Sequence, residues 1–410
     1  MLKFSKYCTI RLDEDLKNWR IQMNQLLYIS KGELFWQQEE RGTTLTCQAI
    51  EKYKSNLREI SQRKEWKTKG AGALFMGLST SNGEEFLGTT GTLVSDAVFT
   101  EEGEFIYSAL LDTGTAIYSK PLSQCENYEG LILRKNDLKV YDMAYDQKNN
   151  RLAIAASTLS YDRHIAILGI DSAHIDFLTE GDSLDGNPYF DPKNPDQLYY
   201  DSCGFAYGEH GNILGVGAKE ICRLNLQSGA LDTILENNKF DFIKPQVDLE
   251  GNLYFIQKPY HSFANTSFSF KNLLLAPVKI IKALVGWLDF FTTRYAGESL
   301  KTTGANPAKM KQKSEEEIFI EGNLINAQKT LTENQKSGEK FPGIAPKSWE
   351  LMKMTRDGKI SSIKKGVLAY RLSKDDEIFY SNGKHLIKIS PQKSEELICE
   401  ANLITKIIYS

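Results

Sequence analysis

Three oxygen-bearing side chains lie close together near the middle of the chain, at Asp182, Asp185 and Asn187. Carboxylate and amide oxygens are the ligands that Ca²⁺ prefers, and the same groups can fix a sugar-like ligand in a pocket. The segment is therefore a candidate site for a divalent metal such as Ca²⁺. The competing interpretation is turn chemistry, because Asp-Gly-Asn-Pro favours a tight turn without any ligand.

A second polar cluster follows in a glycine-rich segment. It comprises Asp201, Tyr207, Glu209 and His210. These residue types can donate and accept protons, so they resemble a general acid/base set. A long hairpin loop is the alternative interpretation.

Other chemical motifs are missing from the sequence. There is no GxxxxGK[ST] phosphate loop, and the nearest match to GxSxG, residues 77–81, lacks the second glycine. The five histidines have no HxH or HxxxH spacing, and the six cysteines form no CxxC. We therefore name no catalytic residue, expect free thiols, and expect no cofactor apart from the metal alternative.

A hairpin pattern recurs along the chain and must position these residues. Each copy has an apolar or aromatic strand end, a turn rich in Asp, Gly or Asn, and an apolar strand with Tyr or Phe. Copies occupy residues 97–107, 143–154, 188–200, 245–255 and 369–380. The equivalent apolar positions Phe105, Leu152, Leu198 and Leu253 are 47, 46 and 55 residues apart. Strand repeats of this length predict an all-β fold, a single β-propeller.

The number of blades follows from the repeats and the chain ends. Ile404–Tyr409 reads as a strand with no following partner, and residues 25–29 and 33–36 supply partners near the other end. We expect these strands to pair and to close the ring. Residues 46–92 contain two short apolar runs that suggest one further blade, so seven blades are favoured and six is the alternative.

One interval breaks the repeat, since Leu253 and Ile378 are 125 residues apart. The sequence thus divides into propeller residues 1–260 (blades 1 to 5), an insertion at 261–345, and propeller residues 346–410, of which 404–410 close the first blade. The second half of the insertion is rich in Lys, Glu, Asn and Gln. We expect it to be a solvated loop with a short strand at Ile318–Ile320.

The first half of the insertion, residues 273–291, predicts an amphipathic helix with a wide apolar face. That face offers an interaction surface made of Ile280, Ile281, Leu284, Trp287, Leu288 and Phe291. It can pack on the propeller or on a second copy, lie in a membrane interface as a peripheral contact, or dock on a protein partner. Lys279, Lys282 and Asp289 argue against a spanning helix.

Composition narrows the class of protein. The net charge is −3, which gives no electrostatic reason to expect nucleic acid binding, and 41% hydrophobic residues are ordinary for a globular protein. Charges interrupt the first residues every few positions, so we expect no signal peptide and a cytoplasmic location.

Two hairpins carry a resemblance to known propellers. Residues 247–255 and the Phe190-Asp191-Pro192 to Tyr199-Tyr200 copy resemble the blades of TolB-like and gluconolactonase-type propellers. That resemblance implies the propeller fold. Gluconolactonase-type enzymes hold a divalent metal at the channel with Glu, Asn and Asp, and this sequence does not offer that full ligand set.

The C-terminal third is similar to a further group of bacterial propellers. The similar stretches are residues 287–295, 349–351, 357–358, 366–370 and 380–383. The group is thought to work beside a MoxR-type ATPase and a von Willebrand A-domain protein, which implies a scaffold or recognition subunit with a protein partner. A metal-dependent hydrolase or lactonase acting at the channel is the alternative function.

Overall fold

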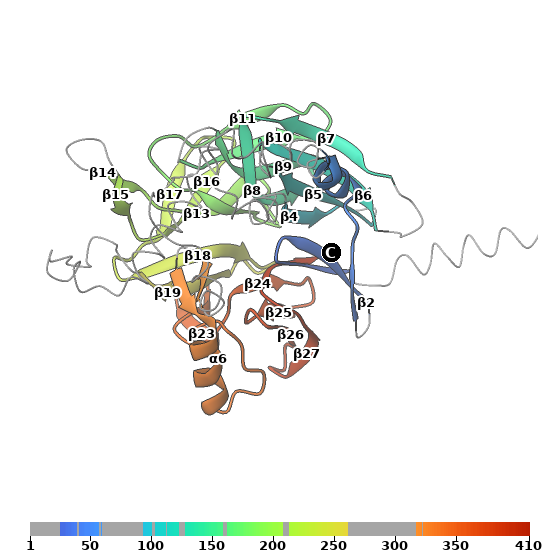
Figure 1. The fold of residues 1–410 in the computed structure, drawn as a ribbon. Helices are drawn as coiled ribbons and strands as arrows, with labels where there is room; N and C mark the ends of the chain where they lie inside the picture. Colours follow the sequence, from blue (N-terminus) through green and yellow to red (C-terminus); the bar gives the residue numbers. More distant parts are fainter. Residues whose placement is uncertain are drawn as a thin grey trace, which may run out of the picture.

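The computed structural model is a β-propeller of six four-stranded antiparallel blades (Figure 1). It describes residues 25–38, 41–56, 59, 93–100, 103–111, 113–122, 128–158, 162–207, 213–260, 317–321 and 323–410. The innermost strands contact one another in the cyclic order β4, β8, β12, β18, β24, β28 and back to β4. The predicted all-β propeller is thereby confirmed.

Each blade is a four-stranded antiparallel meander, and in blade 1 the innermost strand comes from the end of the sequence and the other three from its beginning. Blade 1 contains β28 (Ile404–Tyr409), β1 (Leu26–Ser30), β2 (Glu33–Gln38) and β3 (Arg41–Thr44). Blade 2 contains β4 (Leu93–Phe99), β5 (Glu104–Leu110), β6 (Thr115–Pro121) and β7 (Gly130–Lys135). Blade 3 contains β8 (Leu138–Asp146), β9 (Arg151–Thr158), β10 (His164–Gly169) and β11 (Ile175–Phe177).

The other three blades repeat the arrangement, and two of them carry inserted hairpins. Blade 4 contains β12 (Gly186–Phe190), β13 (Gln197–Ser202), β16 (Glu220–Asn225) and β17 (Leu231–Leu235), with the hairpin β14 (Phe205–Tyr207) and β15 (Ile213–Val216) inserted. Blade 5 contains β18 (Phe240–Val247), β19 (Leu253–Pro259), β22 (Glu350–Met354) and β23 (Ile360–Lys365). Blade 6 contains β24 (Ala369–Leu372), β25 (Ile378–Ser381), β26 (His385–Ile389) and β27 (Glu395–Glu400).

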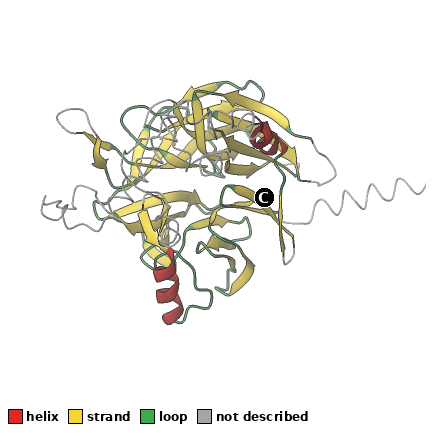
Figure 2. Ribbon diagram, in the orientation of Figure 1, coloured by secondary structure: helices red, strands yellow, loops and turns green. Residues whose placement is uncertain are grey.

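The propeller has six blades. The sequence favoured seven, which is wrong, and six was the alternative. Blades 1 and 2 are direct neighbours because β28 contacts β4, so no blade fits between them. Within residues 46–92, the described part is a helix at residues 48–56 instead of strands (Figure 2). Cys47, Ile50 and Tyr53 are three residues apart and pack on the blade 1 and 2 core, and Glu129 accepts hydrogen bonds from the first N–H groups of this helix. Residues 60–92 lie outside the described part.

The closure of the ring is confirmed. β28 pairs antiparallel with β1, and Leu27 lies opposite Ile408. Beyond the strands, the N–H of Ser410 donates to the carbonyl of Gln25 over 3.2 Å. Strands from opposite ends of the sequence therefore form one blade, in which the innermost strand β28 has an antiparallel partner on its outer side.

The chain between the second and third strands of blade 5 includes residues that belong to neither strand, since β19 pairs directly with β22. Its described part forms the hairpin β20 (Glu317–Ile320) and β21 (Asn323–Asn326), followed by helix α6 (Ala327–Lys336). The strand expected at residues 318–320 is confirmed, but a solvated loop is wrong for this part. Ile325 is buried in the blade 5 and 6 core, and the Asn326 side chain caps α6. The amphipathic helix predicted at 273–291, with all its interaction residues, lies outside the described residues.

Buried strands account for the core. β9 is buried on both faces because blades 2 and 4 flank it, and its small residues allow close approach of the neighbouring sheets. The four described cysteines, Cys47, Cys203, Cys222 and Cys399, are buried free thiols, as expected. In the described part of the chain, no helix is both long and apolar enough to cross a membrane.

Candidate functional site at one mouth of the channel

A β-bulge within each of four successive innermost strands defines one mouth of the channel. The register shifts occur before Asp96 in β4, before Asp142 in β8, around Asn187 in β12 and around Lys244 in β18. Asn187 and Lys244 have positive φ angles of 48° and 57°, an uncommon conformation for residues with a side chain. Bulges redirect side chains and interrupt pairing, so they leave backbone N–H groups that need other partners.

Side chains from the preceding blade supply these partners. Asp96 Oδ2 accepts a hydrogen bond from the N–H of Met143, and Asp142 Oδ2 accepts one from the N–H of Asn187, at 2.9 and 3.2 Å. Asp201 Oδ2 accepts from the N–H of Lys244 at 3.0 Å. One carboxylate per blade thus holds the bulged part of the next innermost strand, which links blades 2, 3, 4 and 5 around the channel.

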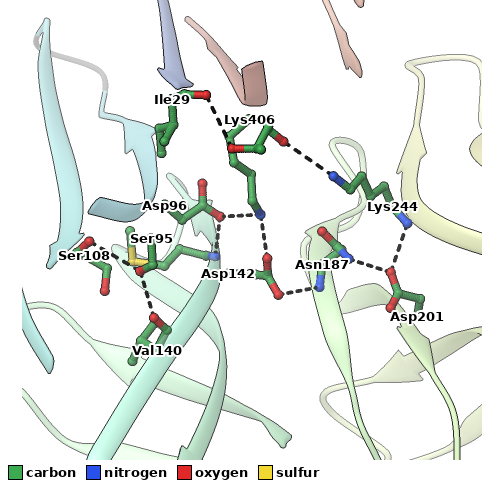
Figure 3. Close-up of polar contacts among 12 residues, drawn as sticks. Ile29, Ser95, Asp96, Ser108, Val140, Asp142, Asn187, Asp201, Lys244 and Lys406 are labelled. Carbon is green, nitrogen blue, oxygen red and sulfur yellow. Dashed lines mark hydrogen bonds and ion pairs between the residues drawn. The ribbon is translucent and has the colours of Figure 1, made fainter. Parts of the chain in front are cut away.

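Lys406 of the closing strand joins two of these carboxylates. Its Nζ lies 2.5 Å from Asp142 Oδ1 and 3.2 Å from Asp96 Oδ2 (Figure 3). The contact connects blade 1 to blades 2 and 3 through one ammonium group. Lysine bears its charge on a compact group with three donors, so it can serve both acids at once.

The two acids respond differently to this environment. Burial raises the pKa of Asp96, and the nearby Asp142 adds to the effect against the opposing charge of Lys406. Burial also opposes ionisation of Asp142, but Lys406 and Arg163 overcome it and hold its pKa well below the ordinary range. The pKa of Lys406 is raised because the attraction of Asp142 and Asp96 exceeds the desolvation of its ammonium. Asp142 is therefore the carboxylate that stays ionised beside Lys406.

A second group of charges continues around the mouth. Asn187 Nδ2 donates to Asp201 Oδ2 at 2.7 Å, and Lys219 Nζ lies 2.7 Å from Asp201 Oδ1. The carboxylate of Asp201 is fully buried and receives donors at both oxygens. Burial opposes the charge of Lys219, yet Asp201 raises its pKa. Asp201 therefore acts as a fixed anion that orders blades 4 and 5.

The insertion also reaches this mouth. Glu321, in the turn between β20 and β21, places Oε1 2.8 Å from Lys244 Nζ. Its backbone carbonyl accepts from Lys258 Nζ at 2.9 Å, and that ammonium also lies 2.7 Å from Asp241 Oδ2. Despite burial, Lys244 and Lys219 lower the pKa of Glu321 to about 2. An ionised glutamate from the insertion thus lies at the opening of the channel.

The channel cavity is narrow, with a volume of about 80 Å³. Pockets for drug-sized ligands are roughly 300–1,000 Å³, so this cavity suits a small group or a single side chain. All six innermost strands line it, and its polar lining includes Asp96, Asp142, Lys244, Arg371 and Lys406. Most of the charges at this mouth form ion pairs with one another.

The structure separates the three residues of the predicted metal site. Asp182 is exposed and accepts a hydrogen bond from Tyr207 Oη, whereas Asp185 is buried and accepts from Thr179 and Ser202 hydroxyls at 2.5 and 2.7 Å. Asn187 alone contributes to the channel lining. Among the described residues, no group of three His, Cys, Asp or Glu side chains is arranged to hold a metal ion. Metal binding by this trio stays a prediction.

The predicted acid/base cluster is also divided between two places. Asp201 lies in the charge network at the channel, and Tyr207 lies exposed on the inserted hairpin β14–β15, as the hairpin interpretation expected. Glu209 and His210 are outside the described residues.

Sequence reasoning singled out Asn187 and Asp201 for other roles and missed the remaining residues of the network, Asp96, Asp142, Lys244 and Lys406. Asp96, Asp142, Asn187 and Lys244 each lie immediately before a recognised hairpin copy and four residues before its turn residue Thr100, Asp146, Asp191 or Asp248. The constant distance of four residues to the turn could have shown that these polar residues occupy the same position in each repeat. Lys406 had no such signal, since its partners lie 264 and 310 residues away.

Comparisons with known proteins add similarities of overall shape. No protein-family model and no curated protein matches the chain. A crystal structure of a nidogen/laminin complex is similar over 94% of this chain and 98% of that chain, with 8% identity and a TM-score of 0.48. TolB from Agrobacterium tumefaciens covers 60% of this chain and 68% of its own, with 14% identity and a TM-score of 0.38. TolB from Acinetobacter baumannii covers 94% and 81%, with 12% identity and a TM-score of 0.34. The strand order and the cyclic contacts between innermost strands alone establish the propeller.

Proposed function

We propose that this protein is a non-enzymatic interaction subunit. It binds a protein partner on the face of the propeller that surrounds the channel mouth at Lys244. The observation that supports it is the position of the two insertions. The hairpin β14–β15 and the long insertion follow β13 and β19, the second strands of neighbouring blades, so both leave the propeller on the same face. Tyr260 Oη donates to the carbonyl of Val216 over 2.6 Å, which ties the two together.

Exposed aromatic area on this face fits a docking role. Tyr207 on β14 is 43% exposed and lies 6.2 Å from the ring of Phe205. Large exposed aromatic side chains are enriched among the residues that dominate binding at protein interfaces. Loops inserted into a rigid scaffold are also the usual location of binding residues.

We further propose that the partner complex contains a MoxR-type ATPase and a von Willebrand A-domain protein in a bacterial cytoplasm. The similarity of the C-terminal third to propellers of that group supports this assignment. The amphipathic segment at 273–291 would supply a second contact, either with the partner or with a membrane surface.

A binding experiment with matched variants tests the proposal. The purified chain is titrated with the MoxR-type ATPase and the A-domain protein of its source organism, and Kd is measured. Tyr207→Asp should weaken binding at least tenfold. Leu249→Asp is the control, because Leu249 is similarly exposed, at 49%, in the β18–β19 turn at the other end of the channel. Equal effects of the two variants, or no binding to either protein, would contradict the proposal.

The same assay tests the segment at 273–291. Trp287→Asp combined with Leu284→Asp should weaken the partner complex if the segment contacts the partner. Loss of sedimentation with anionic liposomes, with partner binding intact, would assign the segment to a membrane surface instead.

Calorimetric titration with Ca²⁺ addresses the alternative of a metal-dependent hydrolase or lactonase. The interaction role predicts no heat that depends on Asp185. Tight binding that disappears in Asp185→Ala would favour the enzyme.

A further inference from the structure

Lys244 is held in an unusual position at the mouth of the channel. Its backbone has a positive φ, its N–H donates to Asp201, and its carbonyl accepts from Tyr370 Oη at 2.6 Å. The side chain is 8% exposed and directs Nζ to Glu321. Residues held in sparsely populated backbone conformations by several contacts are concentrated at binding and switch sites.

The lysines of this mouth differ in where their carboxylate partners come from. Lys219 pairs with Asp201, Lys258 with Asp241, and Lys406 with Asp96 and Asp142. All of these acids belong to the blades. Among the described residues, the one carboxylate within ion-pair distance of Lys244 is Glu321, which belongs to the insertion.

Glu321 is built to present its carboxylate at this point. In the register of β20 and β21, Ile320 lies opposite Asn323, and Glu321, directly after β20, has a positive φ of 47°. Its backbone carbonyl is fixed by Lys258. Among the described residues, the blades therefore supply Lys244 with no carboxylate within ion-pair distance, and the insertion provides one.

We propose that Lys244 forms a carboxylate-binding site for a partner protein, which Glu321 occupies from within the same chain. The ligand is a carboxylate carried by a peptide, either an acidic side chain or a free C-terminus. A buried ammonium without a counter-ion is strongly unfavourable, so displacement of Glu321 creates a demand for another carboxylate. This inference depends on the proposed interaction function and specifies the chemistry of its site.

Internal competition has a consequence for affinity. While Glu321 occupies the site, only the fraction of molecules in which it has moved away can bind an external carboxylate, and apparent affinity falls by that fraction. Removing the side chain of Glu321 should therefore increase affinity for a carboxylate ligand at least tenfold.

Chemical rescue provides the test. Tm of the isolated chain is measured in sodium acetate and in sodium chloride at equal ionic strength. Glu321→Ala should lower Tm, and acetate should restore at least about 2 °C of the loss. The wild type and the double variant Glu321→Ala with Lys244→Met should not respond to acetate.

Glu339→Ala is the matched control. Glu339 is also in the insertion, pairs with Lys347 at 3.3 Å, and is 23% exposed against 25% for Glu321. Its partner Lys347 is 42% exposed, whereas Lys244 is 8% exposed, so the Lys347 ammonium stays hydrated without Glu339 and acetate should not rescue the loss. If Glu321→Ala does not fold, Glu321→Gln preserves the side-chain volume and replaces it in the assay.

Two peptides then identify the source of the carboxylate. One has blocked ends and a central Glu, and the other has a free C-terminus and no acidic side chain. Tighter binding of either peptide to Glu321→Ala than to wild type supports the site and names its ligand. Failure of acetate to rescue, or equal rescue in the double variant or in Glu339→Ala, would overturn it. The acetate and peptide experiments use the isolated chain. They can therefore fail while the Tyr207 experiment succeeds, and they can succeed while the Tyr207 experiment fails.

Discussion

At the scale of single residues, Lys406 has the largest expected effect on stability. It neutralises two buried carboxylates that belong to different blades, and both of them also accept backbone N–H groups. Removing one partner of a buried ion pair leaves an uncompensated charge, which costs about 3–5 kcal/mol. Lys406→Met keeps the aliphatic stem and should destabilise the protein by about that amount in urea unfolding.

Lys388→Met is the control for this variant. Lys388 also contacts two carboxylates, Glu377 and Glu396, but Glu396 is 64% exposed. Ion pairs at the surface contribute roughly 0–1 kcal/mol. Similar losses in both variants would show that the channel network does not stabilise the ring.

The pH dependence of stability follows from the two acids beside Lys406. Because the pKa of Asp142 is lowered in the folded state, its contribution is present above the unfolded value of about 3.9 and disappears as pH falls through the folded pKa. The pKa of Asp96 is raised, so its contribution has the opposite sign: it is present at low pH and disappears as pH rises through the folded pKa. Asp142 should therefore dominate the loss of stability in acid.

Urea unfolding between about pH 2.5 and pH 7 checks this assignment. Asp142→Asn should lower stability at neutral pH and flatten the decline below about pH 4. Asp96→Asn should leave the decline in place. A steep decline that persists in Asp142→Asn, or vanishes in Asp96→Asn, would reverse the assignment.

At the scale of elements, turns and strand pairing were predictable and bulges were not. Asp191 and Asp248 accept hydrogen bonds from N–H groups two residues ahead, the local turn chemistry on which the repeat was recognised. The bulges at Asn187 and Lys244 depend on partners about 45 residues away, and no short sequence pattern reports that contact.

The same distinction explains the errors in the prediction. The extra blade was predicted from the apolar runs at residues 57–60 and 73–78. Ahead of those runs, Cys47, Ile50 and Tyr53 are spaced for one face of a helix, and this signal was not used. The neighbouring blades decided between these alternatives, since β28 and β4 already meet. Asp182 and Asp185 were grouped by proximity in sequence, whereas one is exposed and the other is buried.

At the scale of the whole molecule, stability depends on one non-covalent closure. β28 is the innermost strand of blade 1, and it supplies Ile404, Ile407, Ile408 and Tyr409 to the core, together with Lys406 in the channel. Each buried aliphatic side chain contributes roughly 1.5–3 kcal/mol. Deleting residues 403–410 should therefore lower Tm by at least about 10 °C, measured by circular dichroism. An unchanged melting curve would refute the closure.

A circular permutant separates the closure from the loss of sequence. Joining residue 410 to residue 1 and opening the chain between residues 80 and 81 keeps every side chain and makes β28 and β1 consecutive in one chain. The entropy of closing a loop grows slowly with its length, at about 0.6 kcal/mol per doubling, so moving the connection should change stability little. The permutant should melt within a few degrees of wild type.

Deleting residues 403–410 from the permutant should be as damaging as in the original chain, because the innermost strand and Lys406 are removed in both. A full-length permutant that melted as low as the truncated protein would show that stability depends on where the chain begins. That result would contradict a ring held together by equivalent contacts between blades.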